Sequence, residues 1–363
     1  MTDNELLGGP GRAAPEALTP GGSGGEAPPP GPAPVERKSR VSVPETAALF
    51  VVLLVLFIFF SITSPFFLNE ANIINICQNV ARIGIVACPA TLLLISGQFD
   101  LSVGSVAGFT AMVIAVMAAD PELTKTPFAL GLPLWGALAV AIGAALLVGF
   151  INAVAVTIFR INALITTLGT LAIFRGLTKV VGEGQTIRIN DFGDLGITRL
   201  PLGPFAIPVP VIIFFGVIVA FIVLLRYTTY GRSMYAIGAS PTAARLAGIR
   251  TNRAIFVAFI LSSLAAGLSG LILVSQVGGA SAVAGQGLEL QVITAVVLGG
   301  ASLAGGRGSI VGTILAVLII GVLGNGLIQL RIPSFWIEVF SGILLLAAVG
   351  FDQLRIRFTK AGT

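Results

Sequence analysis

The chain has 363 residues, of which 55% are hydrophobic and only 10% are Asp, Glu, Lys or Arg, and its formal net charge is +5. Soluble domains carry roughly a quarter charged residues, so this composition lacks the surface that water requires and indicates lipid as the solvent. The absence of histidine excludes a Ser-His-Asp triad and a His-ligated metal, and no metal site is predicted. No basic patch with interleaved aromatic residues is present, which argues against nucleic acid as a partner.

Residues 1–42 are rich in proline and glycine. The stretch Pro20–Pro34 contains almost no large apolar side chain, so it cannot bury enough surface to offset the entropy of ordering. We therefore expect a disordered tail. Arg37, Lys38 and Arg40 stand just before the first apolar span, which favours a cytoplasmic location for this tail.

Apolar runs long enough to cross a bilayer follow from residue 45 to about residue 352. They predict an all-α integral membrane protein with about ten transmembrane helices, a membrane domain over 43–354 and a basic cytoplasmic tail over 355–363. The predicted spans are 45–63, 76–95, 101–119, 132–158, 163–181, 208–226, 254–275, 287–300, 309–329 and 335–352. The eighth is short enough to be a broken or re-entrant helix, and Phe57, Phe59, Phe214 and Phe215 are expected to face lipid.

The basic residues indicate how these spans are oriented. If the N-terminus is cytoplasmic, most lysines and arginines outside the spans fall on the cytoplasmic side, as the positive-inside rule requires. The outer side then holds Lys125, Lys179, Arg188, Arg199 and Arg331. This asymmetry supports an even number of spans with both ends of the chain inside the cell.

A short polar segment, Ser96–Gly104, separates the second and third spans and contains Asp100. A carboxylate at membrane depth is costly and usually lines a cavity or has a partner, and the neighbouring glycines indicate non-helical backbone. We predict that Asp100, Ser102 and Gly104 line a polar pathway through the membrane or form a hinge. A simple helix cap is the alternative interpretation of Asp100.

Other polar residues lie on predicted spans. Neutral amides suit the hydroxyl groups of a sugar without the desolvation cost of a charge, so we predict that Asn152 and Asn325 face the same pathway, although most such residues make interhelical hydrogen bonds instead. Glu289 is equally compatible with a solvated span end. For Glu338 we favour a structural pair with Arg331.

The predicted cytoplasmic loop 226–253 contains the signals of a short helix. Ser240 is a suitable N-cap, Pro241 suits the first helical position, and Gly248 stands where a helix-terminating glycine belongs. The helix would present a small face of Ala243, Ala244 and Ala247 that fits a groove on another protein. A basic loop that merely sets topology is the alternative.

Two short segments hint at internal similarity. Gly104–Gly108 and Gly308–Gly312 share the pattern G-S-x-x-G. Because glycine, serine and alanine are abundant here, such matches arise easily, and the predicted topology places both segments in the same direction. The sequence therefore leaves a repeat unproven.

Four segments together resemble permeases of ABC importers of the ribose, xylose and galactoside class, within the branched-chain amino acid and sugar permease superfamily. Ser96–Ser105, Asn162–Gly176 and Ala295–Gly312 are similar to blocks of that family, in family order. The fourth segment resembles the family's ATPase-coupling helix region, G-R-x-x-Y-A-x-G followed by A-A and G-I. Its matching residues are Gly231, Arg232, Tyr235, Ala236, Gly238, Ala243, Ala244, Gly248 and Ile249.

This resemblance implies a multi-pass protein of the bacterial cytoplasmic membrane that imports a sugar or similar small polar solute. The chain has no G-x-x-x-x-G-K-[ST] loop, so it is expected to hold no cofactor and not to be an enzyme by itself. The implied partners are ATP-binding cassette ATPase subunits carrying ATP and Mg²⁺, an extracytoplasmic solute-binding protein, a second permease chain and membrane lipid. A self-sufficient secondary transporter is the alternative, although mid-membrane ionisable groups are few.

Overall fold

The computed structural model describes residues 45–360 apart from 125, 190–195 and 203–204. The predicted disordered tail, 1–42, lies outside the described residues, as do residues 361–363 of the predicted basic tail. The last helix continues to Lys360, so the described part of that tail extends the final span as a helix.

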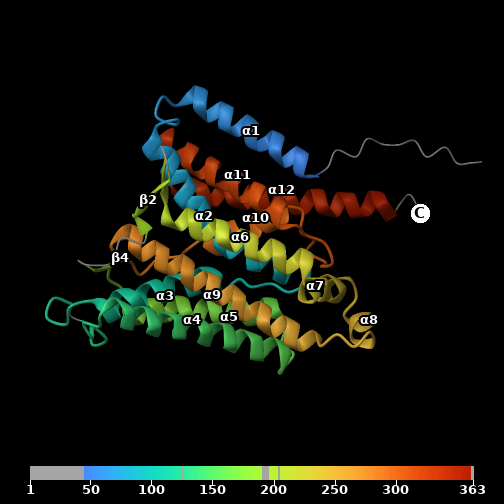
Figure 1. Cartoon of the computed structure of the whole chain (residues 1–363), viewed down its shortest axis with the longest axis horizontal. Helices are drawn as coiled ribbons and strands as arrows, with labels where there is room; N and C mark the ends of the chain where they lie inside the picture. Colours follow the sequence, from blue (N-terminus) through green and yellow to red (C-terminus); the bar gives the residue numbers. More distant parts are fainter. Residues whose placement is uncertain (1–44, 125, 190–195, 203–204, 361–363) are drawn as a thin grey trace, which may run out of the picture. The chain divides into compact units, whose positions relative to one another are not determined.

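The described residues form twelve helices and four short strands (Figure 1). Ten helices correspond in order to the predicted spans: α1 (Glu45–Thr63), α2 (Glu70–Ile95), α3 (Val103–Ala118), α4 (Leu134–Thr157), α5 (Ala163–Val181), α6 (Val209–Tyr227), α9 (Thr251–Val277), α10 (Leu288–Leu298), α11 (Ile310–Gln329) and α12 (Phe335–Lys360). The two others are α7 (Thr229–Ala239) and α8 (Pro241–Leu246). The strands are β1 (Ile187–Arg188), β2 (Arg199–Leu202), β3 (Phe205–Pro208) and β4 (Gly279–Ala280).

The prediction of an all-α multi-span membrane protein is confirmed. Among the described residues, seven helices are long and apolar enough to cross a membrane, and α3, α10 and the apolar part of α12 are shorter apolar helices. The strands form two antiparallel pairs, β1 with β4 and β2 with β3. These pairs connect spans and form no core of their own.

The second span begins earlier than hydropathy predicts. Its N-cap is Asn69, whose side chain accepts a hydrogen bond from the backbone N–H of Ala71 at 3.0 Å. The first turn of α2 carries Glu70 and Asn72, which depress its hydropathy and obscured the true start. An N-cap asparagine with an acidic first turn is a favourable helix beginning.

Helix α2 forms the centre of the membrane domain. It packs against α6, α9, α10 and α11, and 78% of its most apolar window is buried, against 11% for α1. Because α2 is surrounded by protein while α1 is exposed to lipid, mid-membrane polar groups on α2 can be satisfied by neighbouring helices.

Two groups of four helices pack in the same pattern. In the first group, α3 contacts α4, α5 and α9, and in the second, α10 contacts α11, α12 and α2. Helix α9 holds the place in the first group that α2 holds in the second. Since α9 is the fifth predicted span after α2, these two helices run in opposite directions, and so do the two groups. The structure therefore pairs α3 with α10, whereas the G-S-x-x-G match would pair the start of α3 with the start of α11.

One predicted lipid-facing residue lies inside the protein. Phe214 of α6 is only 6% exposed because its ring packs onto α2 at Gly84, where a Cβ atom would overlap the ring. Phe59 and Phe215 are exposed, as predicted, and Phe57 is half-buried with its ring edge against Phe67. A glycine on the facing helix lets a large ring approach closely, and hydropathy alone does not reveal that partner.

Candidate functional site

Helices α3 and α10 are too short to cross the bilayer from edge to edge. At 1.5 Å per residue, their 16 and 11 residues span about 24 Å and about 16 Å, less than the roughly 30 Å hydrocarbon core. Their first turns meet, because a Cβ on Gly104 of α3 would overlap the Glu289 carboxylate of α10 and lie 2.7 Å from the Gly285 carbonyl oxygen. The fold thus brings the positive dipole ends of two half-helices together.

A buried network of hydrogen bonds holds the segment that precedes α3. One carboxylate oxygen of Asp100 accepts from the backbone N–H and the hydroxyl of Ser102, at 3.0 and 2.6 Å, and the other accepts from the Ser262 hydroxyl of α9 at 2.7 Å. The Ser102 oxygen also accepts from the Asn152 amide of α4 at 2.9 Å, and Thr170 of α5 donates to the Asn152 carbonyl oxygen at 2.9 Å. This Asp100 network joins three helices to the α2–α3 segment.

The Asp100 network unites three of the five residues predicted to line a pathway. Asp100 is 5% exposed, and Ser102 and Asn152 are fully buried, so all three contact protein rather than lipid. Gly104 lies at the meeting point of the half-helices, one turn away. The side-chain hydrogen bonds show that these residues fix the position of the α3 N-terminus, and their contact with solute stays a prediction.

The fifth predicted residue, Asn325, lies elsewhere. Its side-chain amide on α11 exchanges two hydrogen bonds with that of Asn72 on α2, at 3.0 and 2.8 Å, and Gln329 donates to the same Asn72 oxygen. This arrangement satisfies both amides and joins α2 to α11. The structure therefore separates Asn325 from the Asp100 network.

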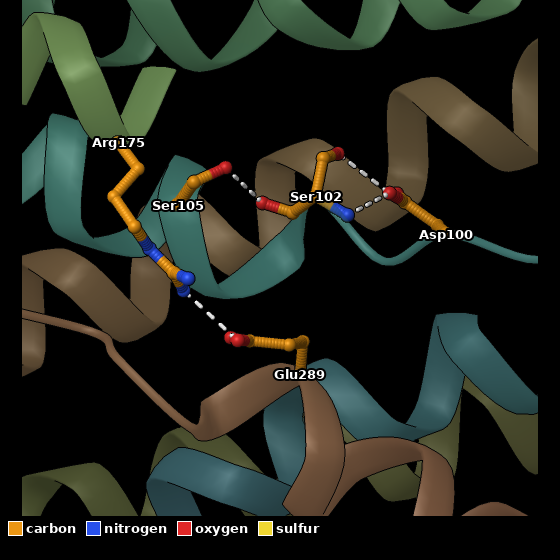
Figure 2. A network of polar contacts seen from close by, with 5 residues as sticks. All are labelled: Asp100, Ser102, Ser105, Arg175 and Glu289. Atoms are coloured by element: carbon orange, nitrogen blue, oxygen red, sulfur yellow. Dashed lines mark hydrogen bonds and ion pairs between the residues drawn. The ribbon is translucent and has the colours of Figure 1, made fainter. Parts of the chain in front are cut away.

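An ion pair connects α5 to the start of α10, and the sequence did not predict it. Arg175 donates to Glu289 at 2.9 Å, and Figure 2 shows the two side chains pointing toward each other. The Glu289 side chain is only 9% exposed, so it is not a solvated span end. Its second carboxylate oxygen has no hydrogen-bond partner among the described residues. The available signal was a basic residue inside one predicted span and an acidic residue at the start of another, since such charges are expected to pair.

The predicted loop 226–253 contains two helices rather than one. Helix α8 begins as predicted, with the Ser240 hydroxyl accepting from the Ala243 backbone N–H at 3.2 Å, and it ends before Gly248, whose φ is +81°. Helix α7 precedes it, and Thr228 caps α7 by accepting from the Gly231 backbone N–H at 3.1 Å. The motif glycines of α7 hid this helix, because glycine has low helix propensity.

Residues 226–253 are called the coupling segment after their predicted role, and several of their motif residues pack against the membrane domain. A Cβ on Gly231 would lie 2.5 Å from the backbone of Leu225, and one on Gly238 would overlap the carbonyl oxygen of Ile95 at the end of α2. The Tyr235 hydroxyl donates to the Gly308 carbonyl oxygen at 2.9 Å, and burial raises the pKa of this phenol, which keeps it a donor. Ala244 is 3% exposed, and Ala236 and Ile249 are half-buried. These contacts connect α7 to α6, to α2 and to the segment before α11.

Other residues of the coupling segment form an exposed surface. Arg232, Ala243 and Gly248 are exposed, and the Leu246 side chain at the end of α8 is 86% exposed. The small face predicted for α8 is thus divided, since Ala244 points inward while Ala243 points outward.

The fold and these buried polar contacts are those of a multi-span membrane protein with polar groups inside it. Residues 72–349 match the family described as branched-chain amino acid transport system / permease component, and the chain belongs to this family. The arrangement of short central helices therefore belongs to a transport protein rather than to an enzyme.

Two curated relatives have similar sequences. The L-arabinose transport system permease protein AraH of Escherichia coli (strain K12) is 37% identical over 309 residues, covering 85% of this chain and 90% of that protein. The ribose import permease protein RbsC of Bacillus subtilis (strain 168) is 40% identical over 309 residues, covering 84% of this chain and 91% of that protein. No solved structure matches the chain.

Proposed function

We propose that this chain is the membrane-spanning subunit of an ATP-driven importer that moves a sugar or a similar small polar solute across the bacterial cytoplasmic membrane. Relatives that cover most of the chain are named as arabinose and ribose permeases. The observation that carries the coupling part of this proposal is α8, a capped helix with an exposed leucine, which packs against α7. Helix α7 in turn contacts the end of α2 through Gly238.

The proposed complex contains partners that supply what this chain lacks. Separate ATPase subunits would bind ATP and Mg²⁺ and contact α7 and α8, and a solute-binding protein would deliver the solute on the outer side. A second permease chain would complete the assembly, since closed symmetric pairs are the commonest arrangement of subunits. Closure of the ATPase subunits around ATP would then move α8 relative to the membrane domain.

A movement of α8 can reach the short helices α3 and α10 through directly packed backbone contacts. Gly238 at the end of α7 contacts Ile95, the last residue of α2, and the Gly306 backbone N–H donates to the Ile95 carbonyl oxygen at 2.8 Å. Ile95 is followed directly by the segment that carries Asp100. Because bulkier side chains do not fit between these backbones, displacement of α7 is transmitted to the α2–α3 segment rather than absorbed by side-chain rearrangement.

The test is solute uptake by vesicles containing this chain, its ATPase partner and its solute-binding protein. The variant Leu246→Asp should abolish ATP-driven uptake while leaving membrane insertion and folding unchanged, because the side chain contacts solvent. The matched control is Leu123→Asp, at a 73% exposed leucine between α3 and α4, outside the coupling segment. Uptake driven by an ion gradient without the ATPase, or normal uptake by Leu246→Asp, would contradict the proposal.

A further inference from the structure

A cavity of about 540 Å³ lies between the β1–β4 pair, α2, α9 and the first turns of α10. Its size is within the range of small-molecule sites, roughly 300–1,000 Å³. Polar side chains on its wall come from five separate segments, and those used below are Arg82, Arg188, Ser269, Ser281, Gln286 and Gln291.

Arg82 is the unusual member of this wall. It lies twelve residues after the start of α2, which places it about 18 Å along that helix. Its guanidinium donates to the Asn79 side chain at 2.6 Å. Among the described residues the only ion pair is Arg175–Glu289, so Arg82 has no carboxylate partner there. A charged side chain at membrane depth is costly and marks a solute pathway by default.

A second arginine stands at the rim of the same cavity. Arg188 of β1 is exposed, and its backbone is held over the α9–α10 segment because β1 pairs with β4, with Arg188 opposite Gly279. No aspartate or glutamate lines the cavity among the described residues. Its wall therefore carries two positive charges, and a cavity of one sign concentrates solutes of the opposite sign.

The wall can satisfy hydroxyl groups as well as an anion. Gln286 and Gln291 offer both donors and acceptors, and the Ser269 hydroxyl makes no hydrogen bond within the described residues. A guanidinium presents a planar fork of donors that matches a carboxylate in two parallel hydrogen bonds. The combined chemistry is that of a polyhydroxylated solute with one acidic group.

We propose that this cavity is a binding site of the permease for a monosaccharide-sized solute, and that Arg82 and Arg188 make it prefer sugar acids to neutral or cationic sugars. This inference rests on the proposed function, because it names the class of solute that the permease accepts. A docked protein is a weaker candidate for the occupant, since its side chains would have to reach Arg82 deep along α2.

The test uses a single cysteine in the cavity of the full chain, reconstituted in vesicles of phosphatidylcholine alone so that no anionic lipid headgroup competes. Cys77→Ser and Cys88→Ala remove the native thiols, and Ser281→Cys places one on the cavity wall. The labelling rate is measured with the anionic reagent MTSES and the cationic reagent MTSET. We expect the ratio of these rates to favour MTSES and to fall roughly tenfold in Arg82→Gln.

Protection from labelling tests the class of solute. D-Glucuronate should slow labelling, whereas D-glucose, which differs only in lacking the carboxylate, and the cation D-glucosamine should protect much less. Arg82→Lys should keep the rate ratio because it keeps the charge, and Arg199→Gln, on β2 outside the cavity, should change neither readout. Far-ultraviolet circular dichroism confirms that each variant is folded.

Equal protection by glucose and glucuronate, or a rate ratio that Arg82→Gln leaves unchanged, would overturn the proposal. Protection by added phosphatidylglycerol as strong as the protection by glucuronate would assign the anion to lipid and would also overturn it. Labelling requires no ATPase and no transport, so failure here leaves the importer assignment intact, and failure of ATP-driven uptake leaves these labelling results unaffected.

Discussion

The two partners of the Arg175–Glu289 ion pair can be replaced one at a time. We predict that replacing Arg175 lowers the free energy of unfolding more than replacing Glu289. The charged atoms lie 2.9 Å apart, but the Glu289 side chain is 9% exposed whereas the Arg175 side chain is 31% exposed. Arg175→Met leaves a buried carboxylate without its partner, which costs about 3–5 kcal/mol in buried pairs. Glu289→Gln keeps an acceptor for a guanidinium that is partly exposed, so we expect a cost of only about 1–2 kcal/mol.

The double variant separates this explanation from simple loss of contacts. Arg175→Met with Glu289→Gln contains no unpaired charge, so its free energy of unfolding should resemble that of Glu289→Gln alone. It should lie well above the value expected if the two single losses added. The assay is equilibrium unfolding by SDS in mixed micelles, followed by circular dichroism. Lys179→Met, one turn further along α5 and in no ion pair among the described residues, is the control.

Two results would refute the reasoning. If Glu289→Gln destabilises the protein as much as Arg175→Met, the difference in burial does not control the cost. If the two losses simply add in the double variant, the charges do not interact in the folded protein. Either outcome would remove the ion pair as the contact that holds α5 to the start of α10.

Three further predictions concern the coupling segment and the Asp100 network. Gly238→Val should abolish ATP-driven uptake, because its side chain would overlap the Ile95 carbonyl oxygen. The control is Gly216→Val in α6, where a Cβ meets no neighbour, and it should transport normally when initial uptake rates are compared. Asn152→Leu should lower the free energy of unfolding by about 1–3 kcal/mol in the SDS assay, since Ser102 and Thr170 each lose a hydrogen bond to this amide. Unchanged stability would argue against the network. Burial raises the pKa of Tyr230 above its ordinary value of 10.0, so its contribution to stability should be complete below pH 10. Above pH 10 it should be lost progressively as the pH rises through the raised pKa of the folded protein, and Tyr230→Phe should remove that loss.

The sequence predicted the spans because lipid selects for apolar composition over a fixed length, and that requirement is local. The ten predicted spans match ten apolar helices in order, of which α3 and α10 are too short to cross the bilayer. The Ser240 cap of α8 was predicted for the same local reason. Family motifs indicated the coupling segment and the α2–α3 segment. The start of α2 was misplaced because its polar first turn is satisfied by α11, a partner that lies far away in the sequence.

Which polar groups meet was decided only by the tertiary structure. Composition marked Asp100, Asn152 and Asn325 alike as intramembrane polar residues, yet the first two share one network while Asn325 pairs with Asn72. The Arg175–Glu289 contact joins residues 114 positions apart, one on α5 and the other in the first turn of α10. The cavity around Arg82 is lined by segments far apart in the sequence, among them β1 and β4, which pair with each other. Hydropathy is a property of one segment, whereas the partner of a buried polar group is a property of the packing between segments.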